Sequence, residues 1–108
     1  MNKVLSCLGL AKKAGKLSVG TASTLDEIKN KKALLVILAS DASDNTKKLI
    51  TDKAKFRSIP YQELDCTCSE MGDALGKTAC ACAAITDKSF VKMFEQAKNK
   101  SGGNTIWQ

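Results

Sequence analysis

The run Ala33-Leu34-Leu35-Val36-Ile37-Leu38-Ala39 is apolar at every position and shows no alternation with polar residues. A β-strand that is covered on both faces has this pattern, as in a sheet that lies between two layers of helices. A second run of the same kind, Ala79-Cys80-Ala81-Cys82-Ala83-Ala84-Ile85, occurs closer to the C-terminus. The two runs predict two strands that are buried in the interior of the protein.

Helical and extended patterns alternate along the rest of the chain. Apolar residues recur every three or four positions over residues 3–14, whereas residues 17–19 are consistent with a short strand. Helices and strands in alternation are typical of an α/β protein, and we expect a three-layer α/β/α sandwich around four strands. In the first half of the chain we expect a helix over residues 3–14 ended by Gly15, a helix from Gly20 to about Asn30, and a helix after the loop 40–46 with Leu49, Ile50 and Ala54 on its apolar face. A further strand begins at Ile59-Pro60-Tyr61, and it is followed by a short helix that is capped by Ser69 and ended by Gly76. A last helix is capped by Thr86 or Asp87, with Phe90, Val91 and Phe94 facing inward.

The length of 108 residues fits one domain that can bury a core without disulfides or a structural metal. We expect this domain to span residues 1–98. Residues 99–108 are polar and rich in glycine, and they are expected to form a flexible tail that includes Trp107.

The net charge of +6 is unevenly distributed. Residues 1–60 contain 12 Lys and Arg against 5 Asp and Glu, whereas residues 61–108 contain 5 against 6. Such asymmetry predicts a polyanionic partner, which on charge alone could be RNA, DNA or an anionic membrane. No apolar run approaches the length of a membrane span, and the N-terminus is a poor signal peptide, so we expect a cytoplasmic protein that does not enter a membrane.

Six lysines lie along residues 12–32, around a junction of small residues from Ser18 to Thr24. The helix that opens after Gly20 presents free backbone N–H groups and the positive end of its dipole, which is where phosphate groups bind. The alternative is an ordinary capped helix with solvated lysines around it. The candidate anion-binding residues of this stretch are Lys12, Lys13, Lys16, Gly20, Thr21, Ala22, Ser23, Lys29 and Lys32.

The chain contains no histidine, which removes the commonest general base, the commonest metal ligand and every Ser-His or Cys-His dyad. The loop from Asp41 to Asp44 could hold Mg²⁺, but its Asp and Ser residues are better explained as caps of the next helix. Neither a P-loop nor a dinucleotide-binding fingerprint occurs. We therefore expect no cofactor, no metal and no enzyme activity.

Two Cys-x-Cys pairs, Cys66/Cys68 and Cys80/Cys82, have a tighter spacing than structural zinc sites use. On one strand Cys80 and Cys82 would point to the same face and could converge. We favour the simpler interpretation that the five cysteines are free thiols that pack as small hydrophobic residues. With only five aromatic residues, and with Phe90 and Phe94 at core spacing, RNA would be bound through lysines and small residues rather than an aromatic platform.

Several motifs, taken in order and spacing, resemble the bacterial YlxQ-type proteins of the kink-turn-binding ribosomal protein superfamily of L7Ae and L30e. The resemblance covers roughly residues 4 to 95. The residues that carry it are Leu8-Gly9-Leu10-Ala11-Lys12-Lys13-Ala14-Gly15-Lys16-Leu17, Gly20, Leu35-Val36-Ile37-Leu38-Ala39-Ser40-Asp41-Ala42-Ser43-Asp44-Asn45-Thr46-Lys47-Lys48, Thr51-Asp52-Lys53, Ile59-Pro60-Tyr61, Met71-Gly72, Leu75-Gly76-Lys77 and Ala84-Ile85-Thr86-Asp87-Lys88-Ser89-Phe90.

The resemblance implies an α/β/α sandwich with a central mixed four-stranded sheet. It also implies binding of kink-turn RNA, a sharply bent duplex with tandem sheared G·A pairs. The helix after Gly20 would enter the widened groove at the bend, and a loop before the last strand would pack against bases flipped out of the stack. Carried over, the first element is Gly20, Thr21, Ala22 and Ser23, with Asp26 and Lys29 further along the helix, and the second is Lys77, Thr78 and Ala79.

Three positions depart from the stronger kink-turn binders, which have Asn and Glu directly after Gly-Thr and a Lys one turn later. Here these positions are Ala22, Ser23 and Asp26. Ala22 cannot hydrogen-bond a guanine edge, and Asp26 places negative charge where a lysine would meet the RNA. Lys29, Lys31 and Lys32 can compensate through contacts with the RNA backbone.

The sequence thus favours a non-enzymatic, monomeric protein that binds structured RNA, either a kink-turn or ribosomal RNA, in association with the ribosome. The alternative is a protein-interaction or ribosome-docking module that has lost kink-turn recognition. A small enzyme is disfavoured because no catalytic constellation is present.

Overall fold

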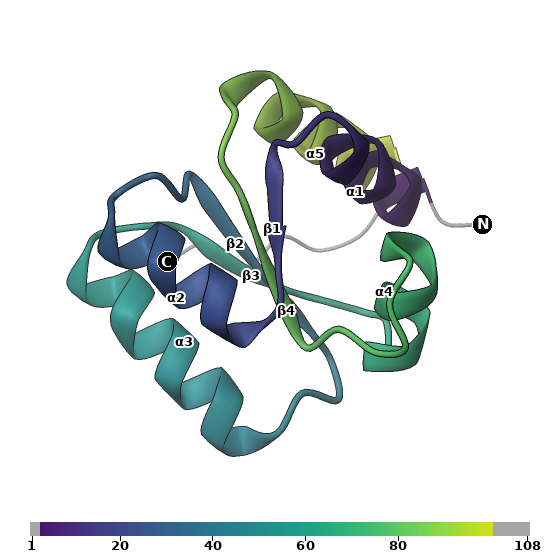
Figure 1. Ribbon diagram of the computed structural model, residues 1–108. Helices are drawn as coiled ribbons and strands as arrows, with labels where there is room; N and C mark the ends of the chain where they lie inside the picture. Colours follow the sequence, from purple (N-terminus) through teal and green to yellow (C-terminus); the bar gives the residue numbers. More distant parts are fainter. Residues whose placement is uncertain (1–2, 101–108) are drawn as a thin grey trace.

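The computed structural model describes residues 3–100, with side chains as far as Ala97. Helices and strands alternate along this part of the chain, as the sequence predicts (Figure 1). The elements are α1 (Lys3–Lys13), β1 (Leu17–Val19), α2 (Thr21–Lys29), β2 (Leu35–Ala39), α3 (Asp44–Phe56), β3 (Tyr61–Leu64), α4 (Cys68–Leu75), β4 (Cys82–Ile85) and α5 (Lys88–Lys100).

The four strands form one mixed sheet in the order β1-β4-β2-β3. The two apolar runs supply its centre, because β2 and β4 pair antiparallel with Leu35 opposite Ile85 and Leu38 opposite Cys82. β1 pairs antiparallel with β4, and β3 pairs parallel with β2. Pro60 precedes the edge strand β3, where its lack of an N–H group removes no ladder bond.

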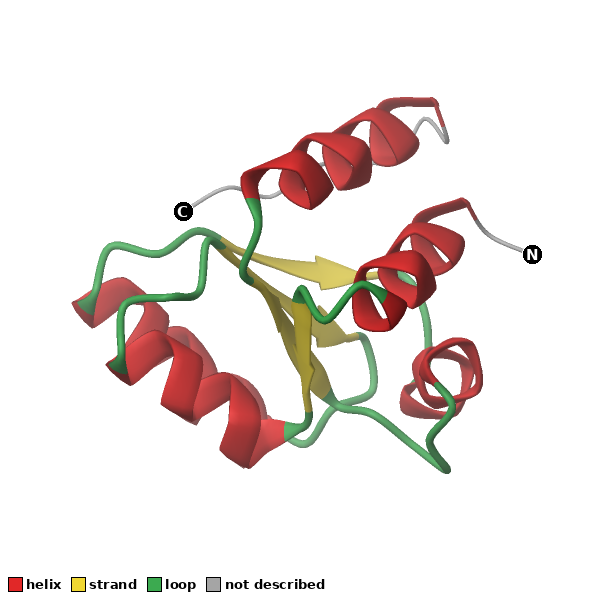
Figure 2. Cartoon of the chain, turned by 45° about the horizontal axis from the view of Figure 1, so that its top comes forward, coloured by secondary structure: helices red, strands yellow, loops and turns green. Residues whose placement is uncertain are grey.

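Helices cover both faces of the sheet, so the predicted three-layer α/β/α sandwich is confirmed (Figure 2). Every residue of β2 is buried, and successive side chains enter opposite layers. Leu35 and Ile37 pack with α1, α4 and α5, whereas Val36 and Leu38 pack with α2 and α3. Burial of each such side chain contributes about 1.5–3 kcal/mol, which explains why the run contains no polar residue.

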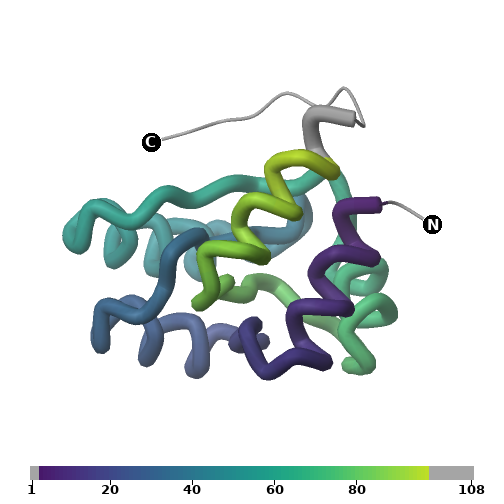
Figure 3. The backbone as a smooth tube through the Cα atoms, turned by 90° about the horizontal axis from the view of Figure 1, so that it is seen from above, coloured from purple at the N-terminus to yellow at the C-terminus, as the bar shows by residue number. Residues whose placement is uncertain are grey.

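Helices α1 and α5 lie side by side on one face (Figure 3). Phe94 of α5 is fully buried there, with Phe90 and Val91 packed beside it as predicted. α5 is capped by Asp87, whose Oδ1 accepts a hydrogen bond from Ser89 N at 2.8 Å. α5 runs to Lys100, so residues 99 and 100 are helical; the rest of the predicted tail, with Trp107, lies outside the described residues.

Both central strands are shorter at their N-terminal ends than the apolar runs predict. Ala33 N donates to Glu27 O of α2 at 3.1 Å, and Cys80 N donates to Cys68 O at 2.9 Å, so neither amide is used by the sheet. The expectation that Cys80 and Cys82 share a face is therefore wrong. Cys80 packs in the layer of α1, α4 and α5, whereas Cys82 packs in the layer of α2 and α3.

The loop after β2 supplies caps, but not only for the next helix. Ser43 caps α3, since its Oγ accepts from Thr46 N at 3.2 Å, and α3 begins at Asp44, inside the predicted loop. Asp41 caps a different helix, because its Oδ1 accepts from Cys68 N at the start of α4 at 2.6 Å. Hydrogen bonds from the Cys68 side chain and backbone lower the pKa of Asp41.

The cap of α4 is Thr67 and not Ser69, so that prediction is wrong. Thr67 Oγ1 accepts from Glu70 N at 3.0 Å, and Glu70 Oε1 accepts from Thr67 N at 2.9 Å. This reciprocal capping box satisfies two backbone donors, whereas Ser69 already lies within the first turn. Gly76 ends the helix in the left-handed conformation, with φ 72°, as predicted. Within residues 3–100, no helix is long and apolar enough to cross a membrane.

The capping box can be tested with a matched pair of substitutions in α4. We expect Thr67→Ala to lower the free energy of unfolding by about 1 kcal/mol, because it removes the cap from Glu70 N. Ser69→Ala should change it by less than about 0.5 kcal/mol, because Ser69 is exposed and caps nothing. Chemical denaturation of the two variants measures both values. Equal effects, or a larger effect at Ser69, would contradict the assignment of the cap.

Candidate functional site

Three helix starts and the loop before β4 lie along one edge of the sheet, which is the edge formed by the ends of the strands and not by an outer strand. β1, β2 and β3 all end there, and β4 begins there, since Val19 pairs with Ala83 and Leu38 with Cys82. Figure 1 shows this edge below the labels of β3 and β4. The connecting segments at this edge are residue 20, residues 40–43, residues 65–67 and residues 76–81.

The start of α2, Gly20 to Ser23, has no side-chain cap. Gly20 has φ 97°, which glycine adopts without strain, and its N–H donates to Cys82 O at 2.9 Å. By contrast, α3, α4 and α5 each receive a cap from their own Ser43, Thr67 or Asp87. The backbone N–H groups of a first helical turn have no partner within the helix. At the α2 start they are therefore available to an anion.

Small side chains surround this open turn. Ala22 and Ser23 are exposed, and Thr21 is half-buried, with the Cys82 thiol 3.7 Å from its Oγ1. Thr24 is fully buried behind them. No bulky group therefore hinders a phosphate from approaching the amides, and the helix dipole adds positive potential at the same point.

Loop 76–81 is held in place at both of its ends. Lys77 N donates to Gly72 O at 2.8 Å, and Cys80 N donates to Cys68 O at 2.9 Å. Gly72 permits the contact, because a Cβ at that position would lie 2.6 Å from Ala79 Cα and 2.9 Å from Lys77 O. The side chains of residues 77–79 are exposed on a backbone that is packed directly against α4.

The hydrogen bond from Gly20 N to Cys82 O joins the α2 start to the residue that follows loop 76–81. The structure thus brings together the two segments that the resemblance implies for RNA binding. Lys12 joins them from α1, since its Nζ lies 3.8 Å from the position of a Cβ on Gly76. The residues gathered at this edge are Lys12, Gly20, Thr21, Ala22, Ser23, Lys77, Thr78 and Ala79.

Other candidate lysines lie elsewhere. Lys16 precedes β1 at the opposite edge of the sheet, where its carbonyl accepts from Thr86 N at 3.0 Å. Lys29 ends α2, and Lys32 follows it on the way to the start of β2. Lys13 is exposed at the end of α1. The lysines of the cluster are therefore dispersed: Lys12 lies beside loop 76–81, whereas Lys16, Lys29 and Lys32 do not.

The five cysteines are free thiols with raised pKa values. Burial is the main cause in every case, and it raises the pKa of Cys66 and of Cys68 to about 11. At neutral pH these groups are protonated and poor nucleophiles. Within the part of the chain that the structure describes, no three His, Cys, Asp or Glu residues are grouped to hold a metal ion.

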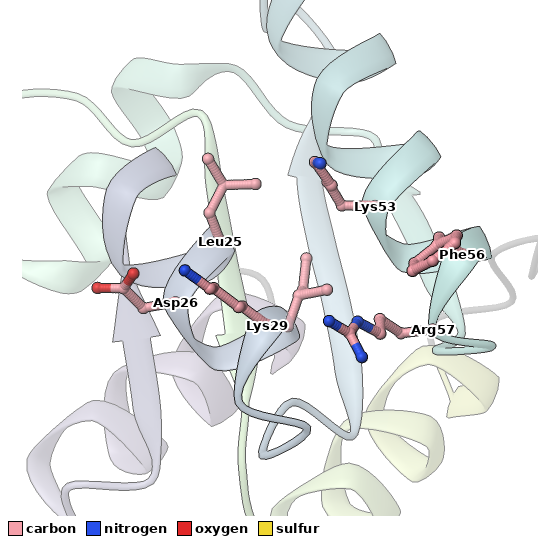
Figure 4. A pocket seen from close by; sticks show the side chains of 7 residues that line it. Leu25, Asp26, Lys29, Lys53, Phe56 and Arg57 are labelled. Carbon is pink, nitrogen blue, oxygen red and sulfur yellow. The ribbon is translucent and has the colours of Figure 1, made fainter.

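Sequence reasoning missed a groove between α2 and α3, with a cavity of about 310 Å³ (Figure 4). Its largest exposed group is Phe56, whose side chain is 79% exposed. Phe56 lies two residues beyond the buried Ala54, about 200° around the helix. This spacing could have predicted from the sequence that Phe56 is on the exposed face of the helix. We call this site the Phe56 groove; it is lined by Leu25, Asp26, Ile28, Lys29, Lys53, Phe56 and Arg57.

Comparison with known sequences confirms the resemblance. Residues 2–94 match the model of the ribosomal protein L7Ae/L30e/S12e/Gadd45 family. A relative named RNA-binding protein YlxQ, from Bacillus subtilis (strain 168), is 40% identical over 83 residues, which cover 77% of this chain and 82% of the relative. The protein of the same name from Enterococcus faecium is 39% identical over 90 residues, which cover 83% of this chain and 85% of the relative.

Solved structures agree with the fold. A protein of unknown function from Bacillus halodurans C superposes with a TM-score of 0.82 at 31% identity, covering 92% of this chain and 99% of that chain. The Giardia lamblia 15.5kD RNA binding protein superposes with a TM-score of 0.72 at 18% identity, covering 91% of this chain and 83% of that chain. At that identity the second similarity shows the fold alone.

The close packing of loop 76–81 on α4 predicts a strong effect of Gly72→Ala. The added methyl group would clash with backbone atoms of Lys77 and Ala79, so we expect a loss of about 1–3 kcal/mol in the free energy of unfolding, or a displaced loop. Ser69→Ala, an uncharged change on the same helix, is the control. Denaturation measures the first effect, and amide chemical shifts of residues 77–81 detect the second. An unchanged stability with unchanged shifts would contradict the contact.

Proposed function

Because the chain belongs to the ribosomal protein L7Ae/L30e/S12e/Gadd45 family and is of its YlxQ type, we propose that it binds RNA with a sharp, kink-turn-like bend. The α2 start and loop 76–81 together form the proposed binding site. The protein acts without catalysis, and its proposed setting is the cytoplasm, as a monomer associated with the ribosome.

The open first turn of α2 is the observation that carries this proposal. A side-chain cap at the N-terminus is worth about 0.5–2 kcal/mol over alanine, and the other helices whose start is described have one. α2 begins with Gly20 instead, and its exposed first turn faces outward beside loop 76–81. Free amides at the positive end of a dipole suit a phosphate or a base edge.

The bent shape of the RNA matters because the site has two parts. Lys12 and Lys77 place positive charge near loop 76–81, and the α2 start supplies neutral donors a short distance away. Backbone amides and lysines bind phosphate groups and carry little sequence information. Ala22 and Ser23 permit close approach but offer few contacts to bases. Recognition would therefore depend on an RNA whose bend lets it contact the α2 start and loop 76–81 at the same time.

A binding titration with kink-turn RNA and a straight duplex of equal length tests the proposal. We expect the kink-turn RNA to bind more tightly, and Ala22→Asp to weaken its binding at least about tenfold, because a carboxylate would repel phosphate at the α2 start. The helix itself should tolerate the change, since an acidic residue in a first turn interacts favourably with the dipole.

Ser89→Asp is the matched control for charge. Ser89 is also exposed and is the second residue of its helix, but α5 begins at the opposite edge of the sheet. The control adds the same charge and should change binding less than about twofold. Equal affinity for the bent and straight RNAs would refute kink-turn recognition. Equal effects of the two substitutions would refute the placement of the site.

The alternative of a docking module that has lost kink-turn recognition rests on Ala22, Ser23 and Asp26. Under this alternative, a chain that carries Ala22→Asn, Ser23→Glu and Asp26→Lys together should bind kink-turn RNA at least about tenfold more tightly than the unchanged chain. Each restored polar contact to a base is worth about 1–3 kcal/mol. The same titration measures the gain, with the straight duplex as its control. Tight binding by the unchanged chain, with no gain from the three substitutions, would eliminate the alternative.

A further inference from the structure

The Phe56 groove lies on the outer side of the helix pair α2 and α3, away from the α2 start. Leu25 and Lys29 come from α2, whereas Lys53 and Phe56 come from the last turns of α3 and Arg57 is its C-cap (Figure 4). Residues three or four positions apart share a helix face, so these side chains meet across the gap between the two helices. The groove therefore combines apolar walls with cations from both helices.

Phe56 is unusual among the aromatic residues of the chain that the structure describes. Its side chain is 79% exposed and belongs to neither buried cluster of the core. The Arg57 guanidinium lies 5.4 Å from the centre of its ring. An aromatic ring beside a planar guanidinium is the surface on which unpaired bases stack in RNA-binding proteins.

The charges of the groove favour an anion. Among residues 3–97 the one ion pair joins Lys47 to Glu63, so Lys29, Lys53 and Arg57 have no carboxylate partner there. The single acidic lining residue is Asp26, and Figure 4 shows it on the far side of the groove from Phe56 and Arg57. Carbonyls at the end of α3 would repel an anion, and those of residues 53, 54 and 55 accept the amides of residues 57, 59 and 58.

The dimensions of the groove fit one flat ring system. A cavity of about 310 Å³ is at the small end of ligand sites, which range over about 300–1,000 Å³. A peptide docked between two helices would need a longer apolar face than one exposed aromatic ring and two aliphatic side chains provide. An aromatic base with an attached phosphate matches the ring, the cations and the size together.

The proposed RNA site and the groove lie at different positions along the same helix, α2. The nine residues of α2 span about 12 Å, which is the length of roughly three or four stacked nucleotides. A strand that leaves the α2 start could therefore reach Lys29 and the ring of Phe56. We propose that the Phe56 groove binds an unpaired nucleotide of the RNA held at the α2 start, with its base on Phe56 and its phosphate on Lys29, Lys53 and Arg57. This subsite rests on the proposed RNA-binding function and extends it.

The test uses the kink-turn RNA with blunt ends and four versions of it, each carrying six unpaired uridines at a different strand end. At least one extension should tighten binding by the intact protein about fivefold or more. Phe56→Ala should remove that gain, since loss of a stacking aromatic weakens binding roughly 5- to 150-fold, and should leave binding of the blunt RNA unchanged. Leu10→Ala, an equally simple truncation of an exposed side chain on the opposite layer, should leave both affinities unchanged.

The outcomes separate the subsite from the function on which it rests. If the blunt RNA binds but no extension tightens binding, or if Phe56→Ala keeps the gain, the subsite is wrong. If neither blunt nor extended RNA binds, both proposals fail. If only extended RNA binds, and does so through Phe56, the subsite stands and kink-turn recognition fails.

Discussion

The antiparallel pairing of β2 with β4 is the constraint on which the remaining structure depends. Both strands are buried on both faces, so they must lie at the centre of the sheet and under two layers of helices. Because β4 runs against its neighbours, the loop before it reaches the edge at which β1, β2 and β3 end. A sheet of four parallel strands would send that loop to the opposite edge. The juxtaposition of loop 76–81 with the α2 start is thus a consequence of one strand direction.

The helix starts at this edge differ in how they complete their hydrogen bonds. Ser43 and Thr67 satisfy the first amides of α3 and α4 locally, and Asp41 reaches across to Cys68 N. Gly20 supplies no side chain to α2, yet glycine at this position costs only a few tenths of a kcal/mol relative to a polar cap. A helix start without a side-chain cap can therefore be maintained with little loss of stability.

Much of the fold follows from the sequence because hydrophobic periodicity is local. The two apolar runs correctly predicted both central strands, and the alternation of helical and extended patterns correctly predicted three layers around four strands. The boundaries were less accurate, because the amides of Ala33 and Cys80 bond to residues that are distant from the sheet. The cap at Thr67 was readable from its Glu70 partner, whereas the cap that Asp41 provides for α4 requires knowledge of which loops are neighbours.

In the candidate site, too, some features could be predicted from the sequence and others required the structure. The helix start after Gly20 was identified from its small residues and free amides, and the loop before β4 through the family resemblance; the hydrogen bond from Gly20 N to Cys82 O brings them together. The lysines are closer along the chain than in space, because β1 lies between Lys16 and the α2 start and the length of α2 lies between that start and Lys29. The Phe56 groove needs two helices at once, and no pattern within α2 or α3 alone reveals that Lys29 and Arg57 face a common cavity.

In the proposed complex, the residues at the α2 start determine what kind of RNA recognition is available. Backbone amides and lysines attract any phosphate, and the small side chains of Ala22 and Ser23 add little discrimination between bases. In the proposed complex, shape would supply the discrimination, because a bent RNA would present phosphates to the α2 start and bases to loop 76–81 at a fixed separation. That separation is set by the hydrogen bond at Cys82 and by the packing of the loop on Gly72. The rigidity of these two contacts, more than any single side chain, would therefore decide which RNA fits.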